Sequence, residues 1–241
     1  MWQALHEELS PLGVTVVTVA MDAETSMAEP WVSVASPTHP SLIDRTHSLG
    51  GALGFVNVPM AAWIDENGVL VRPAESSRIV PNGMAGLEIP PGLPPRIAAR
   101  VELLRHTEAN AHEPYLEALR DWAHRGVDSP FALTPDEVIE RSQPRHADEA
   151  RAAACFEMGE HLRESVGVDA ATPWWREAHR LQPSNWTYKR QAWSLETTPP
   201  GESSDLIQEP TDRYEGNWLD DVVAQGGLRN YTPAFSGPST R

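Results

Sequence analysis

The chain holds a single thiol, which limits the redox chemistry it can perform. Cys155 is the only cysteine among the 241 residues, and one thiol excludes both a disulfide within the chain and a Cys-x-x-Cys motif. It stands beside Phe156 in an alanine-rich stretch with a helical pattern. A free cysteine in such a stretch is most often a small buried apolar side chain. We therefore predict no catalytic role for Cys155.

The other residue types that do chemistry lack the spacings that such chemistry needs. The nine histidines contain no His-x-x-x-His or His-Glu-x-x-His pattern, which argues against a metal site. No Gly-x-Ser-x-Gly occurs, and the glycines within residues 50–54 lack the Gly-Lys-Ser/Thr ending of a phosphate loop. The carboxylates are typical of a solvated acidic face, and their pattern identifies no pair for general acid–base catalysis. We predict no metal, no cofactor and no catalytic residue on this chain.

A proline followed by two apolar segments is the most informative stretch. Residues 60–64 are apolar throughout, residues 69–71 are apolar, and Asn67-Gly68 between them tolerates the positive φ of a tight turn. The pattern predicts a β-hairpin. Pro59 stands at the mouth of the first strand, where a proline is tolerated and where an X-Pro bond is a candidate for the cis form.

This stretch resembles the second half of a thioredoxin-like redoxin of the ResA/TlpA type. The segment Val56-Asn57-Val58-Pro59, an apolar strand, and then Ile64-Asp65-Glu66-Asn67-Gly68 before a second strand follow that family's order of motifs. The resemblance covers residues 1–73, under a third of the chain. It implies an α/β fold with a partial thioredoxin-like sheet and a cis bond at Val58–Pro59. It also implies a substrate groove lined by Val58 and Pro59.

The redox motif of that family is missing from this chain. In the family the motif caps the first helix, whose N-terminus lowers the pKa of the attacking cysteine. The sequence begins, at Met1, inside a segment that resembles that helix. One ResA-like group has Trp-Ala-x-x-Sec-Gly or a Cys version there, and helical repeats further on, and this chain is similar to it in order and spacing. The resemblance implies an upstream Sec or Cys, with Met1 a restart after the selenocysteine codon; a chain that has lost redox function and a chance match of the hairpin are the alternatives.

The missing segment would include a strand in the middle of the sheet. We predict a helix over residues 1–12 and, over residues 14–20, a strand buried on both faces. In the family sheet the middle strand has two neighbours. One corresponds to the strand at residues 14–20 and the other to the strand at residues 60–64. Without it these two strands pair directly, leave a gap or recruit an edge from another chain. We expect direct pairing or a gap.

Residues 152–185 carry the pattern of one tetratricopeptide repeat. Small residues let two antiparallel helices approach closely, and the matching positions with the closing proline are Gly159, Ala171, Trp175, Ala178 and Pro183. Before the repeat, Thr134 and Glu137 stand in capping-box register and predict a helix start. One repeat cannot bury its own apolar face, so we expect it to pack on the rest of the chain. A two-helix hairpin that matches by chance is the alternative.

Charge and hydropathy exclude several classes of partner. The formal net charge of −15 argues against nucleic acid and anionic membrane surfaces, because both reward clusters of Lys and Arg. No apolar run approaches the ~18 residues that span a bilayer, and no signal segment opens the chain. We expect a cytoplasmic location, with an upstream targeting segment left open, and a protein or peptide partner on the helical repeat.

The predicted fold class is α/β followed by an all-α region. The expected parts are a truncated thioredoxin-like domain at residues 1–73 and a Pro/Gly-rich linker or loop at residues 74–95. A helical region follows at residues 96–196, and a mostly extended or disordered tail with one short helix at residues 197–241. The first functional hypothesis is part of a thioredoxin-fold thiol or selenol oxidoreductase that acts on disulfides or peroxides, inactive as given. The second is a non-catalytic interaction module that combines a degenerate thioredoxin-like half with a helical repeat.

Overall fold

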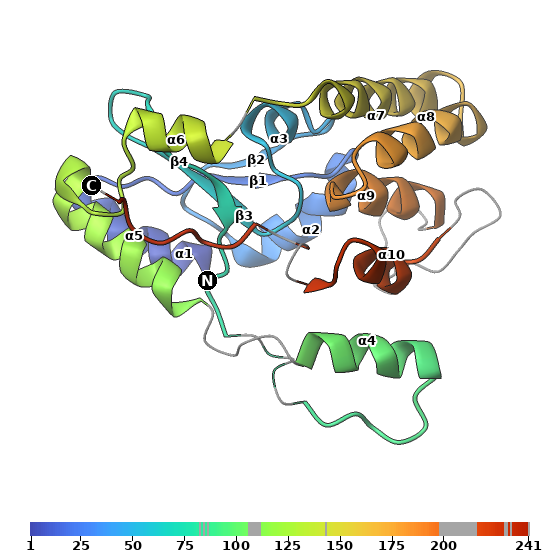
Figure 1. The fold of residues 1–241 in the computed structure, drawn as a ribbon, viewed down its shortest axis with the longest axis horizontal. Coiled ribbons are helices and arrows are strands. Elements are labelled where there is room, and N and C mark those ends of the chain that lie inside the picture. Colours follow the sequence, from blue (N-terminus) through green and yellow to red (C-terminus); the bar gives the residue numbers. More distant parts are fainter. Residues whose placement is uncertain are drawn as a thin grey trace.

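The computed structural model shows a mixed α/β chain (Figure 1). It describes residues 1–81, 83, 85, 87–105, 112–142, 144–197, 216–228, 231 and 233–240. In order, the elements in these residues are α1 (Trp2–Leu9), η1 (Ser10–Leu12), β1 (Thr18–Ala20), α2 (Thr25–Ala35), β2 (Ser41–Ile43), α3 (Ser48–Leu53), β3 (Met60–Ile64), β4 (Leu70–Ser76), α4 (Pro95–Arg105), α5 (Glu113–Arg125), η2 (Gly126–Asp128), α6 (Pro135–Ser142), α7 (Ala147–Ser165), α8 (Val168–Leu181), α9 (Trp186–Thr197) and α10 (Trp218–Ala224). No helix among these residues is long and apolar enough to cross a membrane.

The strands form two separate two-stranded sheets in the described part of the chain. β1 runs parallel to β2, with Thr18 opposite Ser41. β3 and β4 form an antiparallel hairpin, with Met60 opposite Ser76. No ladder joins β1 to β3 within the described residues, so of the two expected outcomes, direct pairing or a gap, the structure shows the gap. Each of the two strands has one edge that pairs with no other described strand.

The predicted hairpin forms, and its second strand is longer than expected. In the turn, Asp65 accepts two backbone hydrogen bonds and Gly68 takes a φ of +78°. Pro73 stands inside β4, where the register shifts so that one residue of β3 faces two of β4. A bulge leaves one residue out of the ladder, so it tolerates a proline without an N–H. β4 continues to Ser76, beyond the predicted boundary at residue 73.

The strand predicted at residues 14–20 is shorter and less buried than expected. Only Thr18–Ala20 forms β1, all three residues are half-buried, and Val17 is 51% exposed. The expectation of burial on both faces was wrong. The physical reason is that only β2 pairs with this strand among the described residues, so its surroundings do not close over it.

Helices α1 and α5 cover the hairpin with an apolar cluster. Leu5 and Leu9 of α1, four residues apart on one face, are buried beside Trp63 of β3. From α5, Tyr115 is buried in the same cluster and its hydroxyl accepts a hydrogen bond from the Trp63 indole at 3.1 Å. The periodicity that predicted the first helix therefore marks the face that packs on the sheet.

The C-terminal residues dock on the hairpin in an extended conformation. The Ser76 N–H donates to the Pro233 carbonyl at 2.8 Å, and the Ser239 N–H donates to the Pro130 carbonyl at 2.6 Å. Phe235 packs between these points. Figure 1 shows the red segment crossing the hairpin to reach the end of the chain. The tail was predicted to be extended or disordered; residues 233–240 are extended and fixed, while residues 198–215 lie outside the described residues.

The helical region has its own core. α7 and α8 form an antiparallel pair, and α9 and α10 pack beside it (Figure 1). The buried members of this core are mostly aromatic residues and alanines: Ala152, Phe156, Ala171, Trp175, Ala178, Trp186, Tyr188, Ala192, Trp193, Trp218 and Val222. The predicted packing of the helical part on the α/β part is confirmed by the contacts described below.

Candidate functional site

The Val58–Pro59 peptide bond is cis, as predicted. It lies where the chain enters β3. Val58 is 51% exposed, and Pro59 is exposed as well. The two residues that the resemblance assigns to a substrate groove therefore share an open, apolar surface at one end of the hairpin, which we call the cis-proline loop (residues 56–59).

A buried asparagine holds the cis-proline loop in place. Asn57 is 1% exposed; its Oδ1 accepts the Val58 N–H at 2.8 Å, and its Nδ2 donates to the Tyr231 carbonyl at 2.9 Å. The Tyr231 hydroxyl lies 2.9 Å from the Trp218 indole nitrogen and 3.3 Å from Arg190 Nη1. Buried amides are hydrogen-bonded because an unpaired one costs free energy. Tyr231 thus links the cis-proline loop to helices α9 and α10.

Backbone hydrogen bonds fix the loop on both sides of Asn57. The Val56 carbonyl accepts the Trp186 N–H at 2.7 Å, and the Pro59 carbonyl accepts the Ser77 N–H at 3.2 Å. Trp186 is the first residue of α9, and the first N–H groups of a helix have no partner within it. The start of α9 therefore satisfies one of these groups on the cis-proline loop, so the helical region borders this surface directly.

The N-terminal helix packs on the hairpin through an apolar cluster. Trp2 of α1 and Ala61 of β3 pack against one apolar cluster, together with Trp63. The first turn of α1 bonds to the segment before β2, where Gln3 Nε2 donates to Thr38 Oγ1 at 2.9 Å. Met1 occupies the N-cap position and supplies no side-chain cap.

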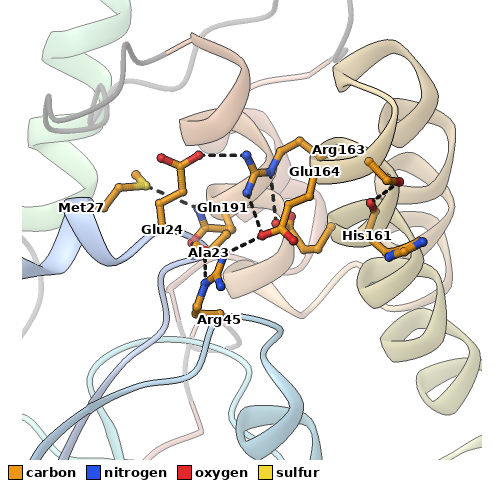
Figure 2. Close-up of polar contacts among 10 residues, drawn as sticks. Ala23, Glu24, Met27, Arg45, His161, Arg163, Glu164 and Gln191 are labelled. Carbon is orange, nitrogen blue, oxygen red and sulfur yellow. Dashed lines mark hydrogen bonds and ion pairs between the residues drawn. The ribbon is translucent and has the colours of Figure 1, made fainter.

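Polar contacts join the helical region to the loops that follow β1 and β2 (Figure 2). The Ala23 N–H donates to Gln191 Oε1 at 3.2 Å. Arg163 of α7 donates to Glu24 at 2.8 Å, and Arg45 donates to Glu164 at 2.5 Å. Because parallel strands end at one edge of a sheet, α7 and α9 cover the carboxyl ends of β1 and β2, the edge where α/β proteins commonly bind ligands.

Burial keeps the Cys155 thiol and the His47 imidazole uncharged at neutral pH. Burial raises the pKa of the Cys155 thiol, so the protonated form is favoured. His47 packs against Phe156 and Tyr188, and burial lowers its pKa to about 4, so its imidazole is neutral at neutral pH. Within the described ranges no group of three His, Cys, Asp or Glu side chains could hold a metal ion.

The repeat residues lie in the helical pair rather than at the cis-proline loop. Ala171, Trp175 and Ala178 of α8 are buried, and Pro183 lies in the turn before α9. A Cβ built on Gly159 would lie 2.5 Å from a Trp175 ring atom, so the two helices approach closely at that glycine. The small residues have the packing role expected of them. Whether the pair is a tetratricopeptide repeat stays a prediction.

Sequence reasoning did not find the residues that connect the two parts of the chain. Glu24, Arg163 and Tyr231 carry no local pattern, and each has a partner that is distant in the sequence. Asn57 had one signal, its position beside the predicted cis bond. Comparisons with protein-family models, with curated proteins and with solved structures found no match to this chain.

Proposed function

We propose that this chain carries the substrate-binding half of a thioredoxin-like thiol or selenol oxidoreductase that acts on disulfides or peroxides. The observation that carries the proposal is the exposed apolar surface of Val58 and Pro59, on a loop that hydrogen bonds anchor from three sides. In this proposal the apolar surface of Val58 and Pro59 receives an extended substrate segment. The attacking sulfur or selenium belongs to a motif that is not found among the residues of this chain.

The two separate sheets support the same proposal. β1 and β3 each have an edge without a strand partner in the described residues, and an open edge favours pairing with a further strand. A strand that pairs with both would join the sheets into one. Running parallel to β1, it would end at the edge that α7 and α9 cover.

The alternative proposal is a non-catalytic interaction module, and the helical pair favours it. Met158 of α7 is 41% exposed and Trp174 of α8 is 40% exposed. In this proposal the two side chains belong to one apolar patch, because contiguous exposed patches mark contact sites for partners. This function needs no thiol, so the absence of a redox motif does not argue against it.

The chain as given is expected to show no thiol–disulfide reductase activity. Its single thiol has a raised pKa, because burial disfavours the thiolate that would attack. Insulin reduction with dithiothreitol should proceed at the rate of dithiothreitol alone. A clear additional rate that disappears in the Cys155→Ser variant would contradict this expectation and would place the nucleophile in the helical pair.

Val58→Asp is expected to weaken the binding of an extended apolar peptide at least about tenfold, because it places an unpaired charge where an apolar contact forms. The probe is a synthetic peptide with an S-methylated cysteine between apolar residues. NMR titration of labelled protein should move the Asn57, Val58 and Ser77 amides in the wild type and not in the variant.

Val69→Asp is the matched control, since Val69 is 47% exposed in the hairpin turn and Val58 is 51% exposed. It should bind the peptide like the wild type. Shifts that cluster around Met158 and Trp174 instead would favour the interaction module, and equal binding by both variants would refute the proposed groove.

A further inference from the structure

The contact between α7 and the α/β part contains more carboxylates than arginines. Arg163, 13% exposed, donates to Glu24 at 2.8 Å and to Glu160 at 3.4 Å, and its Nη2 lies 3.9 Å from Glu164. Arg45 binds Glu164 at 2.5 Å. Three carboxylates thus share two guanidinium groups, as the crowded centre of Figure 2 shows. A fourth carboxylate, Asp22, is nearby in sequence, and burial raises its pKa.

Glu160 is the carboxylate whose charge is least compensated. It is 4% exposed, and its Oε1 is buried without a hydrogen-bond partner among the described residues. Its one cationic neighbour is Arg163, which stands three residues further along the same helix. On the α8 side it faces the buried Trp175, which is uncharged. Ionised Glu160 therefore adds nothing to the contact between the two parts and competes with Glu24 for Arg163.

We propose that protonation of Glu160 favours the closed contact between α7 and the α/β part, and that its ionisation favours opening of this contact. When Glu160 is protonated, it no longer competes for Arg163, and the guanidinium is left to Glu24 across the interface. The remaining charges are then two carboxylates, Glu24 and Glu164, on two arginines. When Glu160 is ionised, opening the contact gives its carboxylate access to water. The inference goes beyond the proposed function and does not depend on it.

The direction of the pH effect follows from linkage. Burial raises the pKa of Glu160 to about 7 in the closed contact, and Arg163 and Trp175 only partly oppose this. In the open contact the value returns towards the ordinary 4.5. Between these two pKa values Glu160 is protonated in the closed contact and ionised in the open one. Closure is therefore favoured at low pH and is lost as the pH rises through 7. His47, whose pKa is about 4, does not titrate in this window.

Hydrogen exchange measures the opening directly. The amides to follow are Ala23 N–H and Trp186 N–H, because their hydrogen bonds, to Gln191 and to Val56, join the α/β part to α9, which shares one core with α7. After correction for the intrinsic exchange rate, their opening should be at least about tenfold less frequent at pH 5.5 than at pH 8. The Leu133 N–H, bonded to Val71 within the α/β part, should keep a pH-independent protection.

Two variants separate Glu160 from its neighbours. Glu160→Gln should protect Ala23 and Trp186 equally at both pH values, and more strongly than the wild type is protected at pH 5.5. Glu164→Gln, which changes a carboxylate that is 53% exposed, should keep the wild-type pH dependence. Retention of that dependence in Glu160→Gln, or its absence in the wild type, would overturn the proposal. If the variant does not fold, an NMR titration of wild-type Glu160 decides, and a midpoint below pH 5 overturns it.

Discussion

Arg72→Met is expected to lower the free energy of unfolding by about 3–5 kcal/mol, the usual cost of removing one partner of a buried ion pair. Arg72 is 1% exposed and pairs with Glu75 at 3.0 Å. It also donates to the carbonyls of Phe131 and Gly237, both at 2.8 Å. Its guanidinium carbon lies 4.4 Å from the centre of the Phe235 ring. The substitution leaves the Glu75 carboxylate buried without its cation and releases the C-terminal segment.

Chemical denaturation measures the loss, and Arg120→Met is its control. Arg120 pairs with Glu8, but both side chains are close to half exposed, so removing that pair should cost at most about 1 kcal/mol. The double variant Arg72→Met, Glu75→Gln should recover part of the loss, because it removes the stranded charge. A cost below about 1 kcal/mol for Arg72→Met alone would show that this arginine does not fix the C-terminal segment.

Gly159→Ala is expected to destabilise the chain by about 1–3 kcal/mol, although alanine favours a helix interior by about 1 kcal/mol over glycine. The reason is the close approach of α7 and α8. A new Cβ would lie 2.5 Å from Trp175 Cδ1 and 2.6 Å from its Nε1. The Trp175 ring is 1% exposed, so it has little room to move.

Thermal and chemical unfolding of Gly159→Ala should be compared with Gly51→Ala. Gly51 also stands in a helix, but its nearest neighbours to a new Cβ would be Arg145 Nη2 at 3.6 Å and the Tyr188 hydroxyl at 3.9 Å, which are ordinary contacts. That control should be neutral or slightly stabilising. Equal effects in the two variants would mean that the helices do not approach closely at Gly159.

Features set by neighbours in the sequence were predicted well. The capping box formed, with the Thr134 N–H bonded to Glu137 Oε2 at 2.9 Å and the Glu137 N–H bonded to Thr134 Oγ1 at 3.2 Å. The hairpin turn and the cis bond before Pro59 also formed. These features depend on the φ preferences and side-chain reach of a few adjacent residues, so a short stretch of sequence contains the information they need.

Burial was predicted less well, because it depends on which elements meet. A run of β-branched residues at 14–20 favours a strand, but its burial requires neighbours on both sides, and β2 is its only partner strand in the described part. The same limit applies to the C-terminal segment. Its Pro- and Ser-rich composition indicates an extended chain, whereas the partners that hold it come from the hairpin, α6 and the Pro130 carbonyl.

By itself, the sequence determined the first helix, the helix start at Thr134, the hairpin turn and the cis-proline loop, because each depends on local chemistry. Tertiary structure alone decided which polar groups became functional candidates. Asn57 bonds Tyr231 across 174 positions, and Arg163 bonds Glu24 across 139. The protonation of Glu160 likewise depends on its burial at a contact between two parts of the fold. The free energy of a buried charge or amide depends on the groups around it. Those groups come from elements that are far apart in the sequence and meet only in the folded chain.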